Sequence, residues 1–392
     1  MKLKRILAVV LALALALALS ACGDNTSASD SGGSLATDEG TGTSGGQTSD
    51  PGTEEGEFGT YYIGYNNFAT GIWELDFCLS YAQSLNDNLG NELNAPSADF
   101  SADKMQSDVQ NLISAGVDGL IYYGSFPTLT PVVSEMCQEG QVAFGMFDQM
   151  PTGDLVDELQ ANPYFAGAVG ANAYDVGYQM GETAASMGYQ RALIIGGAVG
   201  DAAHDGRVEG FTDGFEAGGG SVIGVARCSS PAEAVTKADD LLSAYTDADC
   251  IYGCHGDYIS GSFTAMANRG VQLMGFCTGI DSTLFDEVAD GKLIGDGGTA
   301  VAAALAYCLV ENMLDGHPIL DENGKAPVID DLMNFLVTPE NVDLYQKYWV
   351  DDEAISFEGY QKLLYRYNNE LTYDDFVEFV QNYSLDSIVA EK

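Results

Sequence analysis

Basic residues are scarce in this chain. Its 392 residues include 15 lysines and arginines against 58 aspartates and glutamates, and the formal net charge at pH 7 is −43. Phosphate backbones and anionic lipid headgroups are bound by a surplus of lysine and arginine, and this chain has the opposite imbalance. The composition therefore excludes nucleic acid as a partner, and it excludes attachment to a membrane surface through charge. Such an acidic surplus is typical of a solvated exterior.

The apolar run near the N-terminus is too short to span a membrane. Residues 6–19 are fourteen apolar residues that follow a basic start, whereas a spanning helix needs about 20. This pattern indicates a secretion signal. It ends in "LSAC", which resembles a bacterial lipobox. The resemblance implies that residues 1–21 are a lipoprotein signal peptide and that Cys22 is a lipid anchor, which holds an extracytoplasmic protein on the bacterial cell membrane. The alternative is ordinary secretion, with Cys22 as a core cysteine.

Residues 22–57 lack the side chains needed to pack a core. After Cys22 the segment has 35 residues, with one leucine, no aromatic residue and mostly Gly, Ser, Thr, Asp and Glu. This composition predicts a disordered acidic tether whose ends lie roughly 30 to 35 Å apart. Without residues 1–21, which carry three basic residues and no acidic one, 12 basic residues oppose 58 acidic ones, a formal charge of −46.

Signals of catalysis, metal binding or a cofactor are also missing. The glycine-rich stretch "GGAVGDA" has neither the dinucleotide-binding spacing nor the lysine of a P-loop. His255 has no ligand spacing to His204 or His317, and no nucleophile and base pair stands out. We therefore expect a protein without a cofactor, a metal ion or enzymatic activity.

The cysteines do not form an obvious disulfide framework. Seven remain besides Cys22, and an odd number argues against complete pairing. Cys250 and Cys254 are close in sequence, but in a strand they would be separated by roughly 13 Å, beyond disulfide reach. We expect free thiols in the core or at the edge of a sheet.

From residue 58 onward, apolar strands alternate with amphipathic helices. The pattern begins with a strand at 60–65, a helix at 73–85, a helix at 105–116 and a strand at 117–124, and it repeats through residue 298. Such alternation with short loops predicts parallel sheets covered by helices on both faces. The carboxyl ends of the strands then share one edge, where ligands of open α/β sheets collect.

Several motifs, in their order and spacing, resemble one family. They are "GVDGLIYYG", "FAGAVGANAYDVGYQMGE", "RALIIGG" followed by "HDGRVEGFTDGF", and "MGFCTGIDSTLFDEVADGKLIGDGG". Together they resemble the type I periplasmic binding proteins for sugars, which are similar to ribose- and galactose-binding proteins and to the ligand-binding part of LacI-type repressors. The resemblance covers about residues 60 to 320.

The resemblance implies two doubly wound, parallel-sheet α/β lobes joined by a three-segment hinge, with a solute held between them by hinge closure. The expected N-terminal lobe is 58–168 plus 298–326, and the C-terminal lobe is 169–297 plus 327–338. Crossings are expected near residues 168–172, 296–299 and 327–337.

Arg207 is the first site residue that the resemblance implies. The arginine of the family's "RxxGF" element, here "RVEGF" from Arg207 to Phe211, lines the cleft and donates to ligand oxygens. A guanidinium suits this role because it offers several fixed donors and stays charged when partly desolvated. The alternative is a surface arginine paired with Asp205 or Glu209.

Other expected ligand-binding residues follow the ends of strands. Amides and flat apolar faces near the first strand would suit hydroxyls and ring faces; the alternative for Trp73 is a cap on the core of the N-terminal lobe. The expected set, besides Arg207, is Asn66, Asn67, Phe68, Trp73, Asp148, Gln149, His255, Asp257, Cys277, Thr278 and Asp296.

Three of these positions depart from the sugar-binding pattern. Asp148-Gln149 stands where sugar binders often have Asp-Arg, and His255 replaces the first residue of an Asn-Asp element completed by Asp257. Cys277 and Thr278 follow Gly-Phe where many relatives carry aspartate. Asp296 could supply the missing carboxylate acceptor. The departures leave the identity of the solute open.

Residues 339–392 extend beyond the usual length of the family. Their helical spacing and many tyrosines predict two or three short helices packed on a lobe, with the C-terminal lobe favoured. The motifs "TPENVDLYQKYW" and "NYSL" resemble C-terminal extensions of sugar-binding lipoproteins of anaerobic gut-type bacteria.

The sequence thus predicts a monomeric, lipid-anchored solute-binding protein. It would capture a small polar solute, a sugar by resemblance, and deliver it to the permease of an ABC transporter. A receptor for a nucleoside or signal molecule that feeds a sensor kinase or chemoreceptor is the alternative, and an enzyme is a third. Product formation from a bound solute would identify the enzyme.

Overall fold

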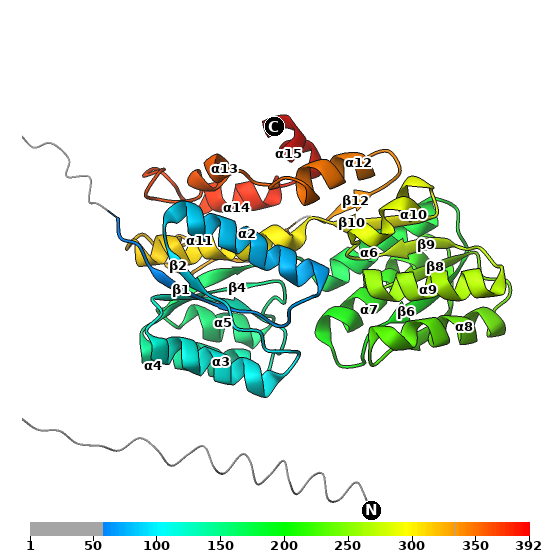
Figure 1. The fold of residues 1–392 in the computed structure, drawn as a ribbon, viewed down its shortest axis with the longest axis horizontal. Helices are drawn as coiled ribbons and strands as arrows, with labels where there is room; N and C mark the ends of the chain where they lie inside the picture. Colours follow the sequence, from blue (N-terminus) through cyan, green and yellow to red (C-terminus); the bar gives the residue numbers. More distant parts are fainter. Residues whose placement is uncertain (1–57, 333) are drawn as a thin grey trace, which may run out of the picture. The chain divides into compact units, whose positions relative to one another are not determined.

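Two six-stranded sheets, each covered by helices, form the two lobes of the protein (Figure 1). The computed structural model describes residues 58–332 and 334–392. The predicted signal peptide, the anchor Cys22 and the predicted tether lie outside the described residues. Among the described residues, no helix combines the length and the apolar character that crossing a membrane requires.

The first sheet is parallel throughout and has the strand order β11-β5-β4-β3-β1-β2. Its strands are β1 Tyr62–Asn66, β2 Glu92–Asn94, β3 Gly119–Tyr123, β4 Ala143–Phe147, β5 Phe165–Val169 and β11 Val328–Ile329. The helices of this lobe are α2 Trp73–Leu89, α3 Ala102–Ala115, α4 Thr130–Gly140, α5 Asp154–Gln160 and α11 Ala302–Leu314.

The second sheet has the order β12-β10-β9-β8-β6-β7, and only β12 runs antiparallel to its neighbour. Its strands are β6 Arg191–Gly196, β7 Ser221–Arg227, β8 Cys250–Gly253, β9 Met274–Cys277, β10 Leu293–Gly297 and β12 Phe335–Val337. The helices of this lobe are α6 Ala173–Ser186, α7 Ala202–Ala217, α8 Ala234–Ala244, α9 Gly256–Arg269 and α10 Phe285–Ala289.

The central strands are buried because helices cover both faces of each sheet. In β3, Leu120, Ile121 and Tyr122 are all fully buried, and in β8 the same holds for Ile251 and Tyr252. Continuous apolar strands of this kind are typical of parallel sheets. The predicted fold class is confirmed.

Glycines allow α6 and α7 to pack at very short range. A Cβ atom added to Gly210 of α7 would lie 2.0 Å from the backbone oxygen of Tyr174, and one added to Gly177 of α6 would lie 2.3 Å from that of Arg207. Side chains at these positions would force the helices apart. The close packing fixes the position of α7, which carries Arg207.

The chain passes between the sheets after β5, after β10 and between β11 and β12. The first and third connections touch, because Ala171 and Asp331 form an antiparallel bridge and Leu332 N donates to Gly170 O at 3.1 Å. Val328–Ile329 pairs with β5 in the first sheet. The sequence analysis placed residues 327–338, and so this segment, in the C-terminal lobe. That boundary was wrong, because the third crossing begins after Ile329. The other lobe boundaries stay predictions.

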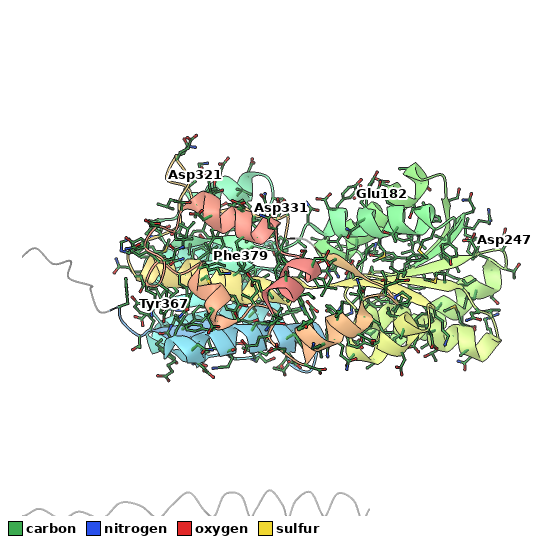
Figure 2. All side chains as sticks on the ribbon, turned by 90° about the horizontal axis from the view of Figure 1, so that it is seen from above. Glu182, Asp247, Asp321, Asp331, Tyr367 and Phe379 are labelled. Carbon is green, nitrogen blue, oxygen red and sulfur yellow. The ribbon has the colours of Figure 1, made fainter. Side chains whose placement is uncertain are left out.

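The C-terminal extension consists of short helices, as predicted, but it has four α-helices and one π-helical turn where two or three helices were expected. They are α12 Val342–Tyr345, the π-helical turn Gln346–Val350, α13 Phe357–Gln361, α14 Tyr373–Gln381 and α15 Leu385–Glu391. Figure 2 shows the extension, with Tyr367 and Phe379, lying over the first lobe, whereas Glu182 and Asp247 lie on the second.

The prediction that the extension packs on the C-terminal lobe was wrong, because its contacts lie mainly on α2 and α11 of the first lobe. Asn312 of α11 donates to Leu363 O at 2.8 Å and accepts from Tyr365 N at 2.7 Å. Tyr81 of α2 donates to Trp349 O at 2.9 Å. The second lobe is reached by α12, whose Tyr345 ring lies 5.8 Å from that of Phe285.

Candidate ligand-binding site

A cavity of about 170 Å³ lies between the two lobes. The start of α2 forms its wall on the first lobe, and the segments that follow β8 and β9 form its wall on the second. The lining residues are Gly71, Ile72, Trp73, Glu74, His255, Asp257, Gly279, Asp281 and Thr283. Because both lobes contribute, the cavity exists in this form only when they are close together.

Trp73 and Glu74 are the first two residues of α2. Gly71 precedes them in the left-handed region (φ 78°), and its N–H donates to both carboxylate oxygens of Asp76 at 3.1 Å. The Trp73 ring packs on Phe77 with the centroids 4.3 Å apart, and Trp73 is partly exposed and lines the cavity. Carbohydrate ring faces stack on aromatic rings of this kind.

His255 caps α9 on the opposite wall. Its Nδ1 accepts from Asp257 N at 3.4 Å and lies 3.7 Å from an Asp257 carboxylate oxygen. Burial, together with the positive charge of Arg207, lowers the pKa of His255. The imidazole is therefore neutral at pH 7 and can serve as a hydrogen-bonding group.

Arg207 lies behind this wall, on α7. Its Nη1 donates to Cys254 O at 3.2 Å, and its buried Nε has no partner in the protein. Burial alone would lower the pKa of Arg207, but the carboxylates, led by Asp148, outweigh it and raise that pKa. Asp148 follows β4 in the left-handed region (φ 69°), a backbone conformation that tends to occur at ligand sites. Arg207 of the second lobe thus interacts with a carboxylate of the first.

Asp296 in β10 has no exposed surface. Its Oδ1 accepts from Gly279 N at 2.8 Å, while its Oδ2 has no partner. Burial raises the pKa of Asp296 to about 6, although the hydrogen bond from Gly279, the charge of Arg207 and the nearby Thr278 hydroxyl oppose this shift. A buried carboxylate oxygen without a donor is energetically costly, so a ligand that donates a hydrogen bond to Asp296 Oδ2 would be stabilising.

Glu74 is a site residue that the sequence analysis missed. Burial raises its pKa to about 7, and repulsion from Asp148 and Asp296 adds to the shift, while Arg207 opposes it. Acidic residues are common in the first turn of any helix, where they interact favourably with the helix dipole. The signal that could have identified Glu74 was its place beside Trp73, directly after the first strand and its loop.

The structure separates the expected site residues into groups. Trp73, His255 and Asp257 line the cavity, and Asp148, Arg207 and Asp296 interact electrostatically with Glu74. The remaining expected residues do not line this cavity: Asn66, Asn67, Phe68, Gln149, Cys277 and Thr278. Their part in binding stays a prediction.

Packing explains several of these positions. Asn66 donates to Met105 O at 3.3 Å, but its Oδ1 and the Nδ2 of Asn67 are buried without a partner. The Phe68 ring stacks on Tyr123 with the centroids 5.4 Å apart. The Thr278 hydroxyl lies 2.8 Å from that of Tyr252, in the core of the second lobe.

The predicted free thiols are confirmed. All seven cysteines of the described residues are buried and unpaired by disulfides. Burial is the main cause that raises the pKa of Cys277 well above its usual value, so it remains a neutral thiol.

Solved structures share the fold at low sequence identity. An ABC transporter periplasmic solute binding protein from Actinobacillus succinogenes 130z with bound D-allose has a TM-score of 0.65 and 14% identity, with 73% of this chain and 100% of that chain covered. The binding protein of the arabinose ABC transporter from Shewanella sp. ANA-3, bound to α- and β-L-arabinofuranose, has a TM-score of 0.63 and 13% identity, with 74% and 96% covered. A periplasmic ribose ABC transporter protein from Conexibacter woesei DSM 14684 has a TM-score of 0.59 and 16% identity, with 74% and 95% covered.

At the level of sequence, the periplasmic binding protein domain matches residues 76–293, more than half of the chain. No curated protein sequence gives a significant match. The matched family is one of binding proteins, which confirms the prediction that the protein is not an enzyme. Because this match covers more than half of the chain and parts of both lobes, the chain belongs to the periplasmic binding protein domain family.

Proposed function

We propose that the protein captures a small sugar in the cavity between its lobes and delivers it to the permease of an ABC transporter. The observation that carries the proposal is the composition of the cavity walls, which come from both lobes and combine the Trp73 ring with polar groups. A solute that touches both walls stabilises the closed arrangement over an open one. Closure around the solute would then present a distinct surface to the permease.

Unpartnered polar atoms support a solute rich in hydroxyl groups. Arg207 Nε and Asp296 Oδ2, which belong to side chains behind the cavity walls, are buried without partners in the protein. Each such atom costs free energy until it is hydrogen bonded. A hydroxyl group can both donate and accept, so a sugar can satisfy both the guanidinium donor and the carboxylate acceptor.

The size of the cavity supports a compact solute. Its volume of about 170 Å³ lies below the range of about 300 to 1,000 Å³ that is typical of sites for drug-sized ligands. The similar structures from Actinobacillus succinogenes and Shewanella hold D-allose and L-arabinofuranose, both monosaccharides. We therefore expect a monosaccharide rather than an oligosaccharide.

The N-terminal residues complete the proposal. A lipid on Cys22 would attach the protein to the outer face of the cell membrane, and residues 23–57 would place the lobes roughly 30 to 35 Å from it. Because the chain carries a formal charge of −43, its surface cannot provide this attachment to anionic lipid. Metabolic labelling with a fatty acid, compared between the natural chain and Cys22→Ser, tests the anchor: no difference in labelling would contradict it.

Thermal unfolding of the purified protein with a panel of monosaccharides, polyols and nucleosides tests the solute. A ligand at a thousand times its Kd stabilises the folded state by about 4 kcal/mol, which gives a measurable rise in unfolding temperature. We expect a rise with at least one monosaccharide, and we expect Arg207→Ala to abolish it.

Arg269→Ala is the matched control, because Arg269 forms a partly exposed pair with Asp239, remote from the cavity walls. This variant should keep the full response. A rise in unfolding temperature with nucleosides alone would contradict the proposed function. A full response in Arg207→Ala would contradict the role of Arg207.

A further inference from the structure

The cavity walls carry uncompensated negative charge. Three of the lining residues, Glu74, Asp257 and Asp281, bear carboxyl groups, and none of the nine is a lysine or an arginine. His255 adds no charge, because burial and Arg207 lower its pKa and keep it neutral. Asp281 accepts from Thr283 N at 2.7 Å, a contact that brings no positive charge.

The buried groups behind the cavity walls do not neutralise this negative charge. One guanidinium, that of Arg207, opposes the three carboxyl groups of Glu74, Asp148 and Asp296. In the described part of the chain, none of these three carboxyl groups has a lysine or arginine nitrogen within 4.0 Å. Each buried carboxylate without such a partner repels its neighbours strongly, since little water screens the charges.

An independent observation points to a donor missing from this cluster. Asp296 is fully buried, its Oδ1 is held by the N–H of the lining residue Gly279, and its Oδ2 has no partner. Asp296 does not itself line the cavity, but it accepts from Gly279 and interacts electrostatically with Glu74, and these two lining residues belong to opposite lobes. Trp73 also lines the cavity, and the indole ring is the aromatic group to which cations bind best.

We propose that the solute is a hydroxylated amine, such as an amino sugar or amino polyol, whose ammonium group is held by Glu74 at the cavity wall, with the buried carboxyl group of Asp296 behind it. An ammonium group supplies a positive charge and three donors, whereas a neutral sugar supplies only donors and acceptors. This inference rests on the proposed function, because it uses the same cavity as the solute site. A bound metal ion is not the favoured explanation: among the described residues, no cluster has the geometry to hold one.

The pH dependence of binding follows from the groups around Glu74. The groups that interact with Glu74 are Cys78, Tyr81, Asp148, Arg207, Asp296, Thr299, Tyr345 and Tyr383. Burial raises the pKa values of Glu74 and Asp296 to about 7 and about 6, so both carboxyl groups lose protons as the pH rises from 5 to 7. Cys78 and Tyr345 stay neutral over this interval, because burial raises their pKa values. An amine with a pKa of about 8 stays charged, so its affinity should rise across this interval.

Isothermal titration calorimetry of the purified protein tests the inference with matched solutes. The probes are D-glucosamine, D-glucose and N-acetyl-D-glucosamine, together with D-galactosamine and D-galactose. We expect at least one amine to bind tenfold or more tightly than its neutral counterparts, and to bind more tightly at pH 7 than at pH 5. Glu74→Gln should weaken amine binding by tenfold or more and flatten its pH dependence, whereas Glu139→Gln, an exposed position on α4, should change neither.

The outcomes separate this inference from the proposed function. Binding of neutral sugars as tight as that of the amines would overturn the inference and leave the proposed function standing. Amine binding that is unaffected by pH and by Glu74→Gln would also overturn it. If none of the probes or any other monosaccharide binds, both the proposed function and the inference fail.

Discussion

The attachment of the C-terminal extension depends on a buried ion pair that can be broken with one substitution. Arg366 of the extension donates to Asp315, which directly follows α11, from Nε at 2.9 Å and from Nη2 at 2.7 Å, and Nη2 also contacts Glu311 of α11. The side chains are 7% exposed for Arg366 and 0% for both carboxylates. Replacing Arg366 with alanine leaves two buried carboxyl groups without a counter-charge, and removing one partner of a buried pair costs about 3 to 5 kcal/mol.

The free energy of unfolding that is lost on Arg366→Ala should depend on pH in a defined direction. Burial raises the pKa of Glu311 from its usual 4.5 to about 7, despite the opposing charge of Arg366. A raised pKa in the folded state means that the associated stability is fully present below pH 4.5 and is lost as the pH rises through 7. Without Arg366 the pKa of Glu311 rises further, so the free energy lost by Arg366→Ala should be larger at pH 8 than at pH 5.

Urea denaturation at the two pH values measures this free energy. Lys362→Ala is a matched control from the same extension, because Lys362 pairs with Glu391 at the surface, with side chains 59% and 43% exposed. Exposed pairs contribute about 0 to 1 kcal/mol. The reasoning would be refuted if Arg366→Ala lost no more stability than Lys362→Ala, or lost more at pH 5 than at pH 8.

Three further predictions concern single positions. Gly210→Ala should cost about 1 to 3 kcal/mol in urea denaturation, because the added Cβ would lie 2.0 Å from Tyr174 O; an unchanged midpoint would contradict this. Asp296→Asn should stabilise the ligand-free protein at pH 7.5 by up to about 3 kcal/mol, because burial raises the pKa of Asp296, and this gain should vanish below pH 4. Solute affinity should nevertheless fall. A loss of stability at pH 7.5 would count against this account. Tyr383→Phe removes the hydroxyl that donates to Gly298 O at 3.0 Å and should lower stability by about 1 kcal/mol, so a neutral or stabilising effect would be inconsistent with that bond.

The architecture was predictable because parallel α/β folds leave a strong pattern. Buried strands such as Gly119–Tyr123 are continuous apolar runs, and each is followed by an amphipathic helix with its own end signal. Gly116, for example, closes α3 in the left-handed region (φ 85°). Where local pattern and tertiary packing agree in this way, the sequence specifies the element.

The third crossing was harder to predict because it depends on very short strands. Val328–Ile329 has two residues, too few to show any periodicity, and only its pairing with β5 assigns it to the first sheet. The docking of the extension had the same difficulty. Asn312 holds Leu363 and Tyr365 through backbone groups, and such contacts leave no mark in the pattern of side chains.

The candidate site was partly predictable. Arg207 and Asp148 were expected from motifs that follow strands, and the structure brings them into electrostatic contact across the lobes. Glu74 was not expected, because its character comes from burial against Asp148 and Asp296, which are distant in sequence. A perturbed carboxyl group of this kind can be recognised only when the fold assembles its neighbours.

The most direct test of solute capture between the lobes is a crystal structure of the protein with its bound monosaccharide. The account predicts electron density for the solute between the Trp73 ring and His255, with hydrogen bonds to groups of both lobes. Density for the solute at a surface formed by one lobe alone would contradict it.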